Sequence, residues 1–208
     1  MKKTLKMAAF AAAMSALSLM SCGDNKTANS EMETTDAQTP IENIMSRTSV
    51  RKFTDRAISK DTLETIVKAG MAAPTAVNKQ PWDFVVVTER AVLDSLMANH
   101  PHSNLATATA AIIVCGNMEK AMEGDGQAYW IQDCSAATEN ILLAAHALGL
   151  GAVWCGVYPM QDRIVPVRET LQLPSYVTPL NIISIGYPAE NPEPKDKWNP
   201  ANVHYQQW

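Results

Sequence analysis

The chain lacks the features of several common functional classes. Its 208 residues carry 17 Lys and Arg against 21 Asp and Glu, which gives a formal net charge of −4. This acidic balance argues against a nucleic-acid partner, because binding to phosphate backbones depends on clustered basic residues. There is no internal repeat, and no Pro/Gly linker divides residues 41–208. We therefore treat residues 41–208 as one domain.

Cysteine is also scarce. The four cysteines are Cys22, Cys115, Cys134 and Cys155, and their spacing is not that of a metal site. The last three have apolar neighbours and are interpreted as buried small hydrophobic residues, of which at most one pair could form a disulfide.

The four histidines have no useful spacing, and no Ser/His/Asp or Cys/His arrangement for nucleophilic catalysis is evident. His146, in the longest helical pattern, is interpreted as a core or interface residue.

The first 21 residues, MKKTLKMAAFAAAMSALSLMS, have the pattern of an export signal. Three lysines precede an apolar stretch that is too short to be a stable membrane-spanning helix. The following LMSC resembles the lipobox of bacterial lipoproteins, in which the cysteine, here Cys22, is lipidated and becomes the first mature residue. The alternative is an ordinary cleaved secretory signal with Cys22 incidental. We expect the polar residues 22–40 to form a flexible tether, and the protein to be lipid-anchored in a bacterial cell envelope, facing the periplasm.

Hydrophobic periodicity in the remaining chain predicts an α+β domain, a modest sheet with helices over it. We expect helices from Ser59 to about Gly70, at 89–99, at 127–148 and near 161–171. We expect strands at 84–88, 109–117, 152–157 and 180–187. The stretch from Pro188 onward is rich in Pro and Asn and ends in VHYQQW, which suggests an irregular arm that packs onto something, such as a second subunit.

Two short segments carry the candidate chemistry. In RTSVRKF, the side chains of Arg47, Ser49 and Arg51 are spaced by two, so an extended backbone directs them to one side. Two guanidinium groups and a hydroxyl would suit a phosphate there; the alternative is a solvated basic edge strand. In APTAVNKQPWDF, the amides of Asn78 and Gln80 each offer a donor and an acceptor, as a heterocycle with alternating C=O and N–H groups requires. The alternative is a loop whose amides satisfy their own backbone.

Together these segments resemble two motifs of the nitroreductase family of flavin mononucleotide (FMN) oxidoreductases. The motif R-x-S-x-R/K is matched at 47–51, the motif P-S/T-x-x-N-x-Q-P-W at 74–82, and GLG-x-x-W at 149–154. The resemblance covers residues 41–208. It implies a nitroreductase-like fold with a mixed or antiparallel sheet flanked by helices, in an intertwined homodimer with FMN at its interface.

The resemblance also implies roles for individual residues. Arg47 and Ser49 would hold the FMN phosphate, and Arg51 would lie near the N1/C2=O edge of the isoalloxazine ring. Asn78 would hydrogen-bond the pyrimidine edge of the ring. Further cofactor contacts are implied for Pro74 and Thr75 along the ring or ribityl chain, for Gly156 through a backbone N–H at flavin N5, and for Lys195 and Lys197, where the family has arginine on the phosphate.

The activity implied is a ping-pong transfer of two electrons. A donor, NAD(P)H in most of the family, reduces FMN by hydride transfer, and an acceptor such as a nitroaromatic or quinone then takes the electrons. NAD(P)H is a cytoplasmic pool, so an envelope lipoprotein implies another donor, such as a membrane quinol. The segments 100–105 and 118–126 could cover the site, but both are short and polar, which favours an open site and a broad range of acceptors. A non-catalytic flavin-binding or electron-storage protein, and a reductive dehalogenase or dehydrogenase of the same fold, remain alternatives.

Overall fold

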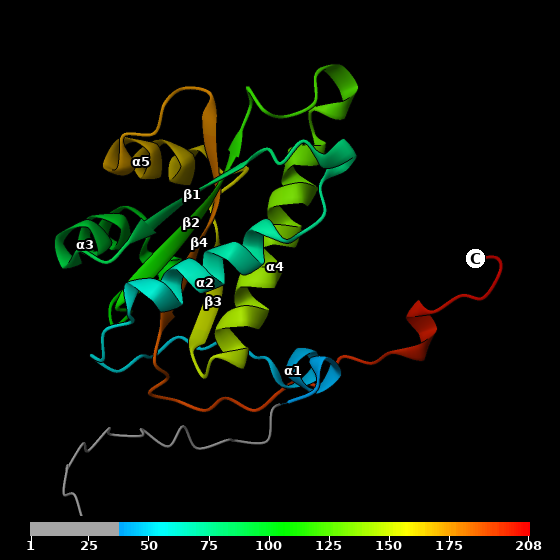
Figure 1. The fold of residues 1–208 in the computed structure, drawn as a ribbon, viewed down its shortest axis with the longest axis horizontal. Coiled ribbons are helices and arrows are strands. Elements are labelled where there is room, and N and C mark those ends of the chain that lie inside the picture. Colours follow the sequence, from blue (N-terminus) through cyan, green and yellow to red (C-terminus); the bar gives the residue numbers. More distant parts are fainter. Residues whose placement is uncertain (1–37) are drawn as a thin grey trace, which may run out of the picture. The chain divides into compact units, whose positions relative to one another are not determined.

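The computed structural model describes residues 38–208 (Figure 1). The predicted export signal, the lipidation site Cys22 and the tether up to residue 37 lie outside the described residues. Within residues 38–208, none of the helices has both the length and the apolar character needed to cross a bilayer.

A four-stranded antiparallel sheet forms the centre of the domain, in the order β1-β2-β4-β3. The strands are β1 (Trp82–Val87), β2 (Ala110–Asn117), β3 (Gly151–Gly156) and β4 (Val177–Gly186). The two central strands carry near-continuous apolar runs, because both of their faces are covered by helices. The predicted α+β class and the antiparallel sheet flanked by helices are confirmed.

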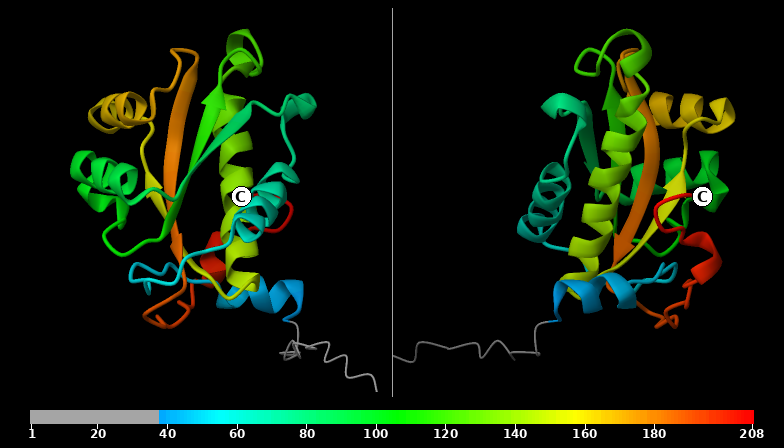
Figure 2. Two further views of the ribbon diagram at one scale, coloured as in Figure 1. Left: turned by 60° about the vertical axis from the view of Figure 1, so that its left-hand side comes forward. Right: turned by 90° about the vertical axis from the view of Figure 1, so that its right-hand side faces the viewer.

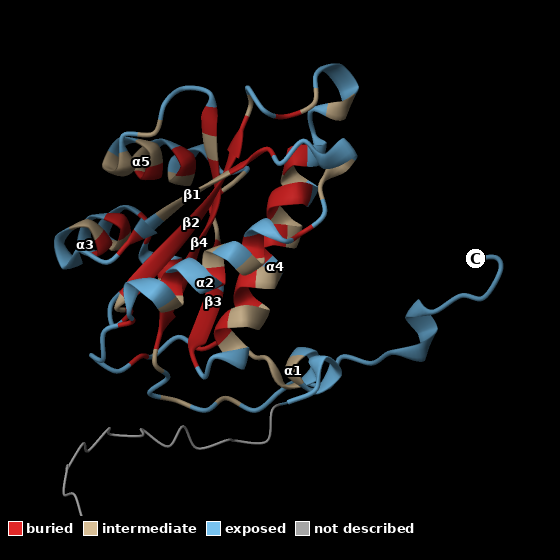
Figure 3. Ribbon diagram, in the orientation of Figure 1, coloured by how far each residue is buried: buried red, intermediate tan, exposed pale blue. Residues whose placement is uncertain are grey.

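Helices cover both faces of this sheet (Figure 2). On one face lie α2 (Lys60–Met71) and α4 (Tyr129–Ala147), and on the other lie α3 (Arg90–Asn99) and α5 (Gln161–Leu171). Side chains alternate along β2, so that Ile112 packs toward α4 while Ile113 packs toward α3 and α5. Figure 3 shows the result, with buried residues concentrated in the central strands and on the sheet-facing sides of the helices.

The local signals placed most elements correctly. Ser59 caps α2, since its Oγ accepts the backbone N–H of Thr62 at 3.1 Å, and α5 has the bounds predicted for it. The start of β1 was placed two residues too late, and that of β4 three. A first helix, α1 (Pro40–Ser46), was not predicted; it begins at the residue taken as the end of the tether. Its capping box joins Thr39 and Glu42.

Three further expectations can be compared with the described residues. Cys115, Cys134 and Cys155 are buried free thiols, as interpreted from their apolar neighbours. The segment from Pro188 is irregular apart from the 3-10 turn η4 (Pro200–Asn202), and Trp208 at its end is fully exposed. The segment 100–105, considered as a short polar cover, combines buried His100, Ser103 and Leu105 with exposed Pro101 and His102.

Candidate functional site

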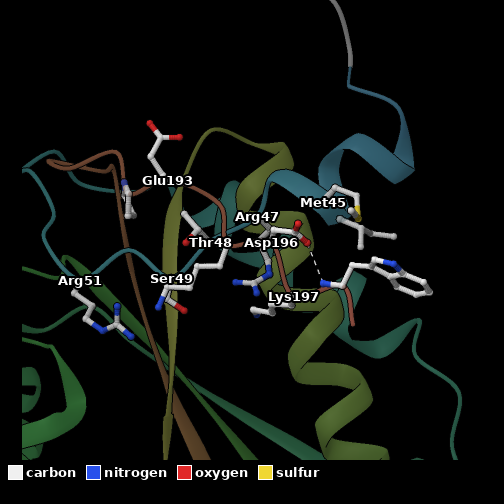
Figure 4. A pocket seen from close by; sticks show the side chains of 12 residues that line it. Met45, Arg47, Thr48, Ser49, Arg51, Glu193, Asp196 and Lys197 are labelled. Carbon is white, nitrogen blue, oxygen red and sulfur yellow. Dashed lines mark hydrogen bonds between the residues drawn. The ribbon is translucent and has the colours of Figure 1, made fainter. Parts of the chain in front are cut away.

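A cavity of about 540 Å³ lies beside the segment that follows α1 (Figure 4). The extended backbone there is held against the edge of the sheet, because Ser49 forms a parallel bridge with Ala152 and the N–H of Val50 donates to the Ala152 carbonyl at 3.1 Å. The cavity brings together five of the residues predicted to contact the cofactor, from both ends of the domain: Arg47, Ser49, Arg51, Lys195 and Lys197.

The cavity is rich in positive charge. Four of the residues lining it are cations, against two lining carboxylates, Glu193 and Asp196. The Nε atom of Arg47 also lies 3.4 Å from Oε1 of Glu139 on α4, and the Arg47 side chain is only 18% exposed. A largely buried guanidinium, two lysines and a serine hydroxyl form a donor set that fits a phosphate group. Arg47 would then bind the phosphate from a position already fixed by Glu139.

Arg51 also lines a second cavity, of about 420 Å³, at the end of the edge strand β3. The other residues lining it include His102, Asn104, Gly156 and Arg163, and no Asp or Glu is among them. A Cβ atom added at Gly156 would meet no heavy atom within 4 Å. The glycine is therefore not required by packing, and its open face leaves room for a flat ligand to approach the backbone.

The loop 74–80 has a strained and internally bonded backbone. Val77, Asn78 and Gln80 all have positive φ, at 45°, 56° and 50°. The backbone N–H of Gln80 donates to Thr75 Oγ1, and the Gln80 side-chain amide donates to Asn78 Oδ1, both at 3.1 Å. Thr75 and Gln80 thus serve the loop itself, while the Nδ2 group of Asn78, which is exposed, can donate to a ligand carbonyl.

This loop does not reach the first cavity within one chain. Pro74, Thr75 and Asn78 are not among the residues lining it. The loop is held at the start of α4, where Ala76 N–H donates to Asp133, whereas α1 is held at the end of α4, where Ser46 Oγ lies 2.9 Å from His146 Nε2. Thirteen helical residues separate these two contacts, or about 20 Å. In Figure 1, the loop that follows α2 and helix α1 lie near opposite ends of α4.

Sequence reasoning missed three residues that hold the site together. Asp133 is buried and accepts the N–H of Ala76 at 2.9 Å. The sequence could have indicated this residue, because an acidic residue lies beside the apolar stripe of α4. His100, at the end of α3, and Arg163, on α5, both donate to the Gly156 carbonyl, at 3.0 and 2.9 Å. Burial lowers the pKa of His100 below its usual range. No spacing in the sequence joins either side chain to Gly156.

Comparisons with known proteins agree with the motifs. A family model described as "Nitroreductase family" matches residues 44–102 and 94–187. An inferred NADH dehydrogenase/NAD(P)H nitroreductase of Methanothermobacter thermautotrophicus is 43% identical over 171 residues, which cover 81% of this chain and 87% of that protein.

Two solved structures extend the comparison. The crystal structure of an inferred NADH dehydrogenase/NAD(P)H nitroreductase from Parabacteroides distasonis is 44% identical, with a TM-score of 0.76 over 81% of this chain and 98% of that one. A nitroreductase-like protein of Desulfovibrio desulfuricans, crystallised in complex with FMN, is 29% identical, with a TM-score of 0.72 over 82% of this chain and 98% of that one.

Proposed function

Because the chain belongs to the nitroreductase family, we propose that it is an FMN-dependent oxidoreductase that passes two electrons from a reductant to small acceptors such as nitroaromatics or quinones. The observation that carries this proposal is the placement of Arg51, which lines both the cationic cavity and the polar cavity at Gly156. The two cavities thus offer adjoining places for a phosphate and for a polar heterocycle, the two ends of FMN.

Residues of the first cavity would hold the phosphate end. Arg47 offers a planar fork of N–H donors, and Ser49 a hydroxyl, while Lys195 and Lys197 add two compact positive charges. Lysine cannot bind a phosphate bidentately, so we assign most of the geometric specificity to Arg47.

Residues of the second cavity would hold the ring. When bound, FMN supplies the hydride-accepting chemistry, and the chain contributes orientation and charge. The guanidinium of Arg51 would lie near the edge of the ring on which negative charge develops during reduction, and a fixed positive charge there favours reduction. The open face beside Gly156 allows the ring to come close to the backbone.

We further propose a homodimer in which each FMN site is composite. The loop that carries Asn78 lies about 20 Å along α4 from the α1 attachment, so a second copy would bring its own loop to the ring. Exposed apolar side chains on α1 and the C-terminal arm, such as Met45 (73% exposed) and Trp198 (71% exposed), offer surface for such a partner.

A heterodimer of two variants, each lacking a different site residue, tests the composite site. Arg47→Ala and Asn78→Ala chains are co-expressed with different tags, and the doubly tagged dimer is isolated. If each site takes Arg47 from one copy and Asn78 from the other, this dimer has one intact site and binds one FMN with wild-type affinity. If each site lies within one chain, both sites carry a defect and no tight binding returns.

We also propose that Cys22 is lipidated, that the protein is anchored in the cell envelope, and that its donor in the cell is not free NAD(P)H. The support is the sequence LMSC, which follows three N-terminal lysines and an apolar stretch, as in a lipoprotein signal.

The full chain, loaded with FMN, is mixed anaerobically with NADH, NADPH or a soluble quinol, and the flavin absorbance near 450 nm is followed. Faster bleaching by the quinol supports the proposed donor, whereas faster bleaching by NADH at physiological concentration contradicts it. Reoxidation by a nitroaromatic or quinone completes the test of turnover, and a flavin that no donor reduces contradicts the proposed activity.

A further inference from the structure

The carbonyl of Gly156 accepts two side-chain hydrogen bonds from separate helices. His100 Nε2 lies 3.0 Å from this oxygen, and Arg163 Nη1 donates to it at 2.9 Å. His100 is the C-cap residue that directly follows α3, and Arg163 lies in the first turn of α5. Both helices pack on the face of the sheet opposite α4. The last residue of an edge strand is thereby tied to two other elements.

These bonds show which way the peptide groups of Gly156 point. Gly156 is opposite Asn181 in the antiparallel β3–β4 pair. Opposed residues in such a pair either exchange both backbone hydrogen bonds or direct both of their groups away from the partner strand. Since the Gly156 carbonyl is taken by His100 and Arg163, the pair is of the second kind. The Gly156 N–H therefore points outward from the sheet edge, on the same side as the carbonyl.

The two donors are of different chemical kinds. A carbonyl oxygen only accepts, so Nε2 of His100 carries the proton in this contact. His100 is 2% exposed, and burial lowers its pKa below the usual range, so the ring is neutral at pH 7. Arg163 contributes a charged donor. Together they hold the Gly156 carbonyl without placing two positive charges beside each other.

We infer that His100 and Arg163 are positioning residues that fix Gly156 so that its outward N–H addresses the ring nitrogen of a bound isoalloxazine. This inference rests on the proposed FMN function. Gly156 lines the second cavity, and a Cβ at this position would touch nothing within 4 Å. Beyond Gly156 the backbone is held only on the β4 side, where the N–H groups of Val157 and Tyr158 donate to the Leu180 carbonyl. The two side-chain bonds add a restraint on the outer side, and a donor that is fixed beforehand loses less entropy on binding.

Flavin affinity separates this role from a merely structural one. FMN and riboflavin are titrated into the flavin-free full chain, and the quenching of flavin fluorescence is measured. His100→Leu and Arg163→Met should each weaken both ligands by the same factor, about three- to tenfold, the range expected for one hydrogen bond. His100→Gln and Arg163→Lys, which keep an N–H donor, should stay within about twofold of wild type. Arg47→Ala should weaken FMN far more than riboflavin, because only FMN has the phosphate.

A second readout does not need flavin. In the flavin-free full chain, the carbonyl ¹³C NMR shift of Gly156 should move in His100→Leu and return toward the wild-type value in His100→Gln. A wild-type chain that binds neither flavin overturns the proposed function, whereas this shift still reports whether the pair holds Gly156. The inference is overturned if the shift does not respond to His100→Leu. It is also overturned if flavin binds with equal affinity to wild type and to the His100→Leu/Arg163→Met double variant, or if His100→Gln is as damaging as His100→Leu.

Discussion

Asp133 on α4 accepts the backbone N–H of Ala76 at 2.9 Å, and through this one contact a buried carboxylate fixes the start of the loop that carries Asn78. Asp is seldom buried unless it is paired with a donor, and here the donor belongs to a segment 57 residues away in the chain. The contact links the longest helix to the loop whose Asn78 we propose as a ring contact.

Replacing Asp133 should therefore loosen the loop as well as the helix. Asp133→Ala leaves the Ala76 N–H without its partner, and we expect the free energy of unfolding to fall by about 1–3 kcal/mol. Asp133→Asn keeps a side-chain oxygen in the same place and should cost clearly less. Urea unfolding followed by circular dichroism measures both values. Equal losses in the two variants would show that the acceptor oxygen is not what matters at this position.

Val77 should be a source of strain in the same loop. It is a β-branched residue at φ 45° and ψ 30°, in the left-handed region that such residues avoid, and it is 74% exposed. Val77→Gly should therefore stabilise the protein, by about 1 kcal/mol. Val86→Gly is the matched control, since Val86 is an exposed residue of strand β1 and its replacement should destabilise. A lower melting temperature for Val77→Gly would contradict the strained geometry.

Gly156→Ala should separate folding from flavin binding. The added methyl group meets no atom within 4 Å in the protein, so the melting temperature should change little. The same methyl would occupy the space assigned to the ring, and FMN affinity should fall at least about tenfold. Gly151→Ala is the contrasting variant, because its Cβ would lie 2.6 Å from Val50 Cγ1 and the fold itself should be destabilised. Unchanged FMN affinity in Gly156→Ala would place the ring elsewhere.

The free energy of unfolding should fall as the pH is lowered below 6.5, the ordinary pKa of histidine. The pKa values of His100 and His146 are both lowered in the folded protein, mainly by burial. Between its folded value and the ordinary value of 6.5, each histidine is protonated more in the unfolded chain than in the folded one. Acid therefore favours unfolding across that window, and above it these two groups contribute no pH dependence.

Urea titrations at pH 7.5 and pH 5.5 measure this loss. The His100→Gln/His146→Gln double variant, which cannot take up these two protons, should lose less stability between the two pH values than wild type. An equal loss in wild type and double variant would assign the pH dependence to other groups.

Local sequence signals predicted the secondary elements where one residue type decides them. Ser59 begins α2 through its own hydroxyl, and the apolar runs of β2 and β4 reflect burial on both faces. The seven-residue α1 escaped prediction because it is too short to show a sustained periodic pattern, although its apolar residues Ile41, Ile44 and Met45 have helical spacing. The early start of β4 was hidden by Pro179, which is opposite Cys115 beside an irregularity in the β2–β4 register.

The site could be predicted only as far as its motifs extend. The spacing of Arg47, Ser49 and Arg51 indicated that they face one cavity, and they line one. The contacts of Asp133 with Ala76, and of His100 with Gly156, join segments more than 50 residues apart. Such contacts depend on how helices pack on the sheet, which no local pattern encodes.

The central claim, that this chain binds FMN through the cavity at Arg47, is tested most directly by one titration. FMN is added to the purified, flavin-free full chain, and to Arg47→Ala and Lys60→Ala variants, and binding is followed by fluorescence quenching. The account predicts one FMN per chain and a loss in Arg47→Ala of about 1.5–3 kcal/mol, the value of a hydrogen bond to a charged group. It predicts no change in Lys60→Ala, an exposed lysine outside the cavity. A wild-type chain that does not bind FMN, or equal affinities in all three proteins, would contradict it.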